Sequence, residues 1–427
     1  MSYPGSHNIF RYELANGITL LVYENFASQS FVLEGVVWAG ALAETAEQAG
    51  LANMTAALLM RGTQSRTHEE IYEAMESVGL ALGFSGGRHL TSFAAQGLVE
   101  DLDLLLELLG QSLRQPTFAE TEVAQVRNQI LTDLHIRATD TRRMASLVFN
   151  HALYQEHPYG PSVQGYFETV PHLSAADLAR FYADHYGPAG MIITLVGAIK
   201  AEVVLAKITA VLGDWQNEQQ RPLPSVPLAA RPDQLARTYT PIPEKSQADI
   251  VLGLPGPPRS APDYLDASLM NTILGVFGMM GRIGQSVREE QGLAYYAYSR
   301  LQGGLGPSPW FAAAGVAPAH IDQAIDSICQ QIERIQNEPV SADELADSKA
   351  YRIGSMPMSL ETNSGLADVI CDMELYGLGL DFLQQYPDMI RSITAVQVQA
   401  AAQKYLSREQ LVVSISGPPL DDYAAVK

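Results

Sequence analysis

The sequence predicts an α+β protein of two homologous domains, each with a mixed, largely antiparallel sheet packed with helices. Three observations lead to this class: the length of the chain, a repeat in the order of its elements, and a proline-rich break between the repeats. At 427 residues, with 47% apolar and 17% charged side chains, the chain exceeds what one hydrophobic core usually serves. Two domains are therefore expected.

The break lies near the middle of the chain. Residues 214–227 are rich in polar side chains and contain three prolines, a composition typical of an extended linker. We therefore place an N-terminal domain at residues 1–215, the linker at 216–235 and a C-terminal domain at 236–427.

The order of elements repeats on either side of this linker, which indicates an internal duplication. Each half opens with a β-rich run and a helical pattern, continues with an amphipathic helix, and closes with a helix that leads into a strand. Strict alternation of strands and helices is absent, which favours antiparallel pairing. The matching segments are 30–39 and 248–254, 50–59 and 264–276, 102–113 and 321–335, and 191–197 and 410–416.

Composition excludes several functions. The 47 acidic residues against 27 basic ones give a formal charge of -20, which opposes binding to nucleic acid or to an anionic membrane. Cys329 and Cys371 are the only cysteines and lie in helical patterns, so we expect core thiols. The N-terminus has no basic segment followed by an apolar one, and no apolar run approaches the length of a membrane span, which predicts a cytoplasmic protein.

Two segments carry the chemistry that the sequence suggests. Residues 50–63 begin with Gly-Leu-Ala and end with Met-Arg-Gly-Thr, and residues 288–295 read Arg-Glu-Glu-Gln-Gly-Leu-Ala-Tyr. With the His-Pro-Tyr-Gly turn at 157–160 and the duplicated halves, these strings resemble the pitrilysin, insulysin and processing-peptidase family, the inverzincins. The resemblance extends from about Phe10 to Gly417. It implies that each domain contributes to one half of a clam-shell.

That family binds zinc through His-x-x-Glu-His on a helix, with two imidazoles as ligands and the glutamate as general base. In this chain the histidine positions hold Asn53 and Ala57, and the glutamate position holds Ala56. The distal carboxylate ligand of the family falls at or beside Asp133. Because a lone carboxylate cannot hold zinc without the imidazoles, the resemblance predicts no metal and no cofactor in this chain.

No other cluster replaces the missing motif. The remaining histidines are scattered, and none forms a helical pair with a carboxylate between its members. An autonomous enzyme with unconventional ligands therefore has little support.

Arg288 and Tyr295 match a pair that the family carries in its C-terminal domain. The resemblance implies that the tyrosine hydroxyl stabilises the tetrahedral intermediate and that the arginine binds substrate carbonyl groups. On spacing alone, the same residues suit a local ion pair with Glu289 or Glu290 and an aromatic strand position. The surrounding motif favours the catalytic interpretation.

Loss of the zinc motif beside retention of this pair predicts a zinc-free, non-catalytic subunit of a heterodimeric metallopeptidase, inactive alone. Its partner would be a homologous chain with His-x-x-Glu-His and zinc, and Arg288 and Tyr295 would act on that site in trans. The shared chamber would bind an extended peptide, which adds by β-augmentation to the strand at 80–84. A homodimer would replace this assembly if no such partner exists. The alternative is a structural or peptide-binding family member with no role in hydrolysis.

Overall fold

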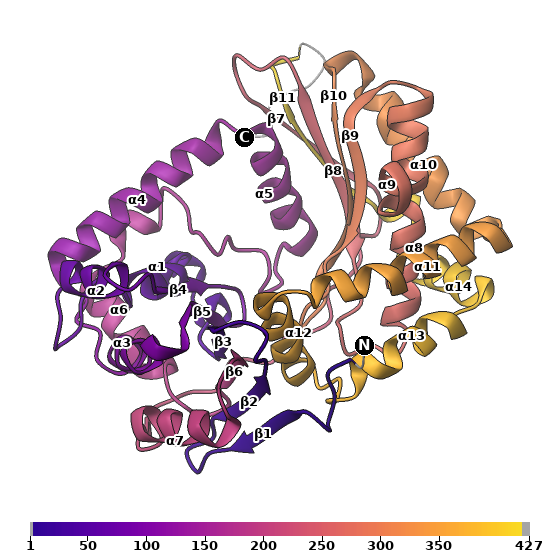
Figure 1. Cartoon of the computed structure of the whole chain (residues 1–427). Helices are drawn as coiled ribbons and strands as arrows, with labels where there is room; N and C mark the ends of the chain where they lie inside the picture. Colours follow the sequence, from indigo (N-terminus) through magenta and orange to yellow (C-terminus); the bar gives the residue numbers. More distant parts are fainter. Residues whose placement is uncertain (1–2, 421–427) are drawn as a thin grey trace. The chain divides into compact units, whose positions relative to one another are not determined.

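The computed structural model describes residues 3–420 of the chain (Figure 1). It forms two compact units, each built around one sheet. The first unit comprises the segment that ends at Leu134 together with Pro161–Ser225 and Pro357–Gln384. The second comprises His135–Gly160, Val226–Met356 and the segment that begins at Gln385. The described part holds no helix both long and apolar enough to cross a bilayer.

The first unit contains a six-stranded sheet in the order β1-β2-β6-β3-β5-β4. The β2–β6 pair is parallel, and the other neighbours are antiparallel. The strand expected at 80–84 is β4, and it lies at an edge of the sheet. The strands are β1 (Ile9–Glu13), β2 (Thr19–Glu24), β3 (Ser30–Val37), β4 (Ala81–Gly86), β5 (Thr91–Leu98) and β6 (Ile192–Gly197).

Helices from the N-terminal half of the sequence bury one face of this sheet. Leu20, Phe31 and Leu33 point into a continuous core that also receives the apolar sides of α1, α3, α6 and α7. The helices of this half are α1 (Leu51–Leu58), α2 (His68–Glu76), α3 (Leu102–Arg114), α4 (Glu120–Ala138), α6 (Ala175–His185) and α7 (Ala201–Leu212).

The opposite face of the same sheet is covered by α12 (Asn363–Leu375), a helix from the far end of the sequence. It packs against β3 and β6, where side chains alternate with those that enter the core. Arg11 ties β1 to this helix, because its guanidinium donates to both carboxylate oxygens of Glu374 at 3.0 and 2.8 Å. The strand side chains buried on this face are Val32, Val36, Ile192, Thr194 and Val196.

The second unit contains a five-stranded sheet in the order β7-β11-β8-β10-β9. Only the β7–β11 pair is parallel. Helix α5 (Thr141–Tyr154), which precedes the linker in sequence, packs against β8 and β11. The other elements are β7 (Ala236–Pro241), β8 (Ala248–Pro255), β9 (Ala294–Leu301), β10 (Pro309–Val316), β11 (Val412–Gly417), α8 (Tyr264–Gly275), α9 (Phe277–Gly284), α10 (Ile321–Asn337), α11 (Ala342–Ser359), α13 (Phe382–Ser392) and α14 (Ala395–Tyr405).

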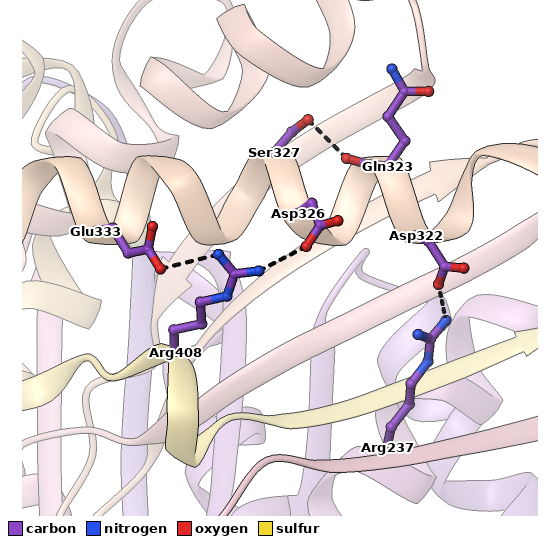
Figure 2. A network of polar contacts seen from close by, with 7 residues as sticks. All are labelled: Arg237, Asp322, Gln323, Asp326, Ser327, Glu333 and Arg408. Carbon is purple, nitrogen blue, oxygen red and sulfur yellow. Dashed lines mark hydrogen bonds and ion pairs between the residues drawn. The ribbon is translucent and has the colours of Figure 1, made fainter.

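Helix α10 of this unit has a buried apolar side and an exposed side that forms ion pairs (Figure 2). One side carries a buried isoleucine stripe at helical spacing, and this burial supplies most of the stability. On its exposed side, Asp322 pairs with Arg237 at 2.6 Å, while Arg408 bridges Asp326 at 2.9 Å and Glu333 at 3.1 Å. Such exposed pairs each contribute about 0–1 kcal/mol. They fix the position of α10 against β7 and the segment before β11 more than they hold the fold.

The fold class that the sequence predicts is confirmed: two mixed, mainly antiparallel sheets are packed with helices. Both cysteines are buried core thiols, as expected. Burial raises the pKa of Cys329 to about 11 and that of Cys371 to about 12, which keeps both protonated and unreactive. The repeat in the sequence does not predict one feature of the fold. Each unit includes a helix from the other half of the sequence, α12 in the first unit and α5 in the second.

A carboxyl pair lies where α12 covers the first sheet. Burial, with a smaller contribution from the negative charge of nearby Asp368, raises the pKa of Glu34 from 4.5 to about 7. A folded-state pKa above the unfolded value means that stability is fully present below about pH 4.5 and is lost as pH rises through about 7. Glu34→Gln should therefore stabilise the chain by about 1 kcal/mol at neutral or higher pH, since the group is only half-buried.

Urea unfolding at acidic and at mildly alkaline pH tests this prediction. The stability gained by Glu34→Gln should be larger at the higher pH. Glu76→Gln, an exposed change on α2, is the matched control and should leave the pH dependence as in the wild type. A gain that is independent of pH would contradict the assignment.

Candidate functional site

Helix α1 carries the positions of the expected zinc motif. Gly50 precedes it with φ 102°, in the left-handed region that favours glycine, and a Cβ there would lie 3.1 Å from the Gly165 backbone. The Glu44 carboxylate accepts hydrogen bonds from the backbone N–H groups of Gly50, at 3.1 Å, and of Ala52. An acid at this end of the helix satisfies donors that the first turn leaves free. The sequence gives no signal for Glu44, because it lies outside the motif.

The motif positions themselves offer no metal ligand. Asn53 is half-buried against the end of β4, where a Cβ on Gly86 would come within 2.6 Å of its Cα. Ala56 is buried and Ala57 is exposed, so two methyl groups stand where the general base and the second imidazole would be. Asp133 lies exposed on α4. Zinc needs imidazole, thiolate or carboxylate ligands in a set of three or four, and these residues do not provide one.

Residues 3–420 contain no group of three or more His, Cys, Asp or Glu side chains arranged to hold a metal ion. The residues present at the family's zinc position therefore do not fit zinc.

The Arg-Gly-Thr end of the motif has a structural role. Arg61 donates to Gln129 at 3.0 Å and lies 3.3 Å from the His68 ring, while Gly62 has φ 126°. Thr63 pairs with Pro116 in an isolated bridge. These contacts surround a polar depression of about 420 Å³ between the α1–α2 turn and the start of α4. Arg61, Gly62 and Thr63 thus make structural contacts that do not require the histidines missing from the motif.

Arg288 lies in a π-helical segment, Gln285–Glu290, which continues α9. Such segments are rare and often occur at functional sites. The chain then turns at Gly292, with φ 63°, and enters β9. The backbone N–H of Leu293 donates to Val287 at 3.0 Å, and both side chains are buried. The segments on either side of Arg288 are therefore fixed to the core.

Upstream of Arg288, a second arginine fixes α9 to α11. Arg282 is almost fully buried and donates from Nε and Nη2 to the two carboxylate oxygens of Glu344, at 2.7 and 2.5 Å. This bidentate geometry is the strongest form of an arginine–carboxylate pair. It holds the helix from which the Arg288 segment extends. The sequence does not single out either residue.

The two candidate catalytic side chains are accessible. Arg288 keeps 38% of its side chain exposed, and its one ion pair among the described residues is with the adjacent Glu289, at 3.4 Å. A surface pair of this kind contributes little, so a ligand can replace it. Tyr295 is 84% exposed, and its hydroxyl makes no hydrogen bond to another residue in the described range.

The neighbouring tyrosines of β9 differ from Tyr295. The Tyr296 hydroxyl donates to Asp249, and the Tyr298 hydroxyl accepts from Arg142 at 2.7 Å. Both of these hydroxyls make hydrogen bonds within the second unit, whereas the Tyr295 hydroxyl makes none to a described residue. Arg288 and Tyr295 share the second compact unit, and the motif positions of α1 lie in the first.

Two family models match successive parts of the chain. The insulinase model of peptidase family M16 matches residues 21–165, and the peptidase M16 inactive domain matches residues 172–351. The chain belongs to peptidase family M16. This membership confirms the resemblance drawn from the motifs, and the second half is of the inactive-domain type.

Relatives and solved structures agree with this assignment. A Streptomyces coelicolor protein named as an uncharacterized zinc protease is 26% identical over 91% of this chain and 85% of its own length. A Bacillus subtilis protein with the same description is 23% identical over 84% and 86%. The peptidase M16 inactive domain from Pseudomonas fluorescens has a TM-score of 0.88 at 25% identity, covering 98% of this chain and 100% of that one. A Helicobacter pylori protease shares the fold, with a TM-score of 0.89 at 18% identity over 97% and 100%.

Proposed function

We propose that this M16 chain is a zinc-free, non-catalytic subunit of a heterodimeric metallopeptidase. The observation that carries the proposal is a contrast between two places on the chain. Helix α1 carries Asn53, Ala56 and Ala57 where zinc chemistry requires histidine and glutamate, while Tyr295 on the strand β9 is exposed. The chain thus lacks the metal-binding half of a peptidase site and offers groups suited to the other half.

Arg288 and Tyr295 would supply that other half in trans. A tyrosine hydroxyl aimed at the tetrahedral intermediate donates a hydrogen bond to the developing negative charge, and one such donor is worth about 10²–10³ in kcat. The Arg288 guanidinium would bind substrate carbonyl oxygens once it leaves Glu289. The partner would contribute the zinc ligands and the general base.

The edge strand β4 is suited to bind the peptide backbone. Its outer edge has no partner strand in the described structure, and Ala81, Gly83 and Ser85 expose only small side chains along it. A Cβ on Gly83 would meet nothing within 4 Å, so the face of the strand at this residue is open. An extended peptide could therefore add to the sheet through main-chain hydrogen bonds.

The test is to purify the chain from its native cell and identify a companion of similar size that bears His-x-x-Glu-His. Zinc content and hydrolysis of a fluorogenic peptide are then measured for each chain alone and for the mixture. We expect zinc only in the companion and hydrolysis only in the mixture. Full hydrolysis by the companion alone would reject the proposal.

The Arg288–Glu289 ion pair favours one alternative, a structural or peptide-binding member without a role in hydrolysis. In that case the turnover of the companion would be the same with and without this chain.

A further inference from the structure

One face of the edge strand β9 carries a row of aromatic and basic side chains. Pairing with β10 is regular from Leu301 opposite Trp310 to Tyr296 opposite Gly315. Alternate residues of this stretch therefore share a face, which places Tyr296, Tyr298 and Arg300 on one side. Ser299 points to the other side, where its hydroxyl donates to Asn271 of α8. In Figure 1, β9 lies at the edge of the sheet, with one side of its backbone unpaired by any described strand.

The first tyrosine of the row is fixed by a buried acid. Asp249 on β8 is 4% exposed and accepts hydrogen bonds from the hydroxyls of Tyr296 and of Thr141 on α5. The Tyr296 ring reaches across β10 at Gly315, where a Cβ would lie 2.6 Å from a ring carbon. The missing side chain at this position is what allows the ring to lie flat over the sheet.

Arg142 from the first turn of α5 completes the cluster. Its Nη2 donates to the Tyr298 hydroxyl at 2.7 Å, and its guanidinium carbon lies 4.8 Å from the Tyr296 ring centroid and 5.5 Å from that of Tyr298. Both distances are in the range of cation–π attraction. The guanidinium is therefore held in one place while the residue stays exposed.

Neither basic residue of the cluster forms an ion pair within 4.0 Å in the described structure. Arg142 has a longer-range attraction to the buried Asp249, whose oxygens are already used by Tyr296 and Thr141. Other arginines of this unit do pair, among them Arg237, Arg282 and Arg334. Arg142 uses one of its five N–H donors on Tyr298, which leaves donors for a bidentate partner. One fixed and one exposed guanidinium, neither in a close ion pair, stand out in a chain of net charge -20.

We propose that Arg142, Tyr298 and Arg300 form a subsite on β9 that binds a carboxylate of a peptide. The carboxylate is either the C-terminus of the peptide or an aspartate or glutamate side chain, since both offer the planar oxygens that a guanidinium binds bidentately. The ligand is taken to be an extended peptide, and only that part rests on the proposed function. A peptide that adds along the free edge of β9 would direct alternate side chains toward this face.

The overall negative charge opposes an acidic ligand, but short-range contacts decide the outcome. At physiological ionic strength, charges further away than about 8 Å are largely screened. Hydrogen bonds from a fixed guanidinium to a carboxylate act at about 2.7–2.9 Å and contribute about tenfold or more in affinity. Binding should therefore be selective for carboxylates and should weaken as salt is added.

Fluorescence anisotropy with the full chain and labelled Ala/Ser/Gly peptides tests the subsite. One peptide has a free C-terminal carboxylate, a second is amidated, a third is amidated with two internal glutamates, and a fourth has glutamines in their place. We expect a carboxylate-bearing peptide to bind about tenfold more tightly than its neutral match. A gain from the free C-terminus identifies the terminal carboxylate as the ligand, and a gain from the glutamates identifies a side-chain carboxylate. Equal affinities, or no binding by any peptide, would overturn the proposal.

Variants assign the effect to the cluster. Arg142→Gln and Arg300→Gln should each bring the affinity of the carboxylate peptide close to that of the neutral peptide. Arg334→Gln is the matched control, because it removes the same charge from an exposed arginine on α10 and should leave selectivity within about twofold. Tyr298→Phe keeps the ring but releases the guanidinium, so we expect a smaller loss.

Near-UV circular dichroism and thermal unfolding show that each variant is folded. An equal loss in Arg142→Gln and Arg334→Gln would indicate a general charge effect and contradict the subsite. The measurement uses this chain alone, so it stands whether or not a zinc-bearing partner is found.

Discussion

Tyr295→Phe should lower kcat for peptide hydrolysis by the assembled complex by about 10²-fold, with little effect on folding. The ring is 84% exposed, and no described residue uses its hydroxyl, so the fold loses nothing when that group is removed. The loss should come from the transition state, where the hydroxyl would donate to the developing negative charge. Steady-state kinetics on the reconstituted pair measures kcat and KM separately.

Tyr351→Phe is the matched control, since it removes the hydroxyl of another exposed tyrosine in the same unit. Its kcat should stay close to that of the wild type. Arg288→Ala should raise KM as well as lower kcat, because the guanidinium would bind substrate carbonyl groups before and during the reaction. Equal rates for Tyr295→Phe and Tyr351→Phe would place Tyr295 outside the chemistry and favour the structural alternative.

The parts of this site that could be predicted from the sequence are those encoded by short, local patterns. Helix α1 follows from the apolar run that begins after Gly50, and it lies within the expected range 50–59. The loss of zinc ligands follows from the residue types at Asn53, Ala56 and Ala57 alone. The strands and helices of the two halves follow from apolar periodicity and lie within a few residues of the expected ranges.

The parts that could not be predicted depend on contacts between residues far apart in the sequence. Glu34 is a single acid in an apolar strand, and its raised pKa arises only because α12 covers it. Arg142 lies in the polar first turn of a helix. Its guanidinium is held by Tyr296 and Tyr298, which lie more than 150 residues later in the sequence. The sequence favours no particular partner for either residue, since a lone charge on a strand or helix is usually solvated.

The exchange of helices has a larger consequence, which is that the two halves of the chain should not fold stably when made separately. A fragment that ends in the linker lacks α12, and four apolar side chains on β3 and β6 would then face water: Val32, Val36, Ile192 and Val196. At about 1.5–3 kcal/mol for each fully buried side chain, this exposure costs about 6–12 kcal/mol. That range is comparable to the whole stability of a typical domain, about 5–15 kcal/mol.

The C-terminal fragment has the reciprocal defect. It lacks α5, which buries Phe149 against Phe311 and donates the Tyr154 hydroxyl to the Pro307 carbonyl at 2.5 Å. Asp249 would also lose the hydroxyl of Thr141, and a buried carboxylate that loses a donor is costly. Each fragment alone should therefore lack a cooperative thermal transition, and mixing the two should restore one, because each carries the helix that the other needs.

Calorimetry and near-UV circular dichroism of fragments divided in the linker test this prediction. The control is the intact chain with a protease site inserted in the same linker and cut after folding, which should keep both pieces together with a nearly unchanged transition. If the N-terminal fragment alone unfolds cooperatively near the temperature of the whole chain, α12 is dispensable and the exchanged helices do not govern stability. The opposite result would mean that the first sheet forms stably only when residues from the far end of the sequence have joined it.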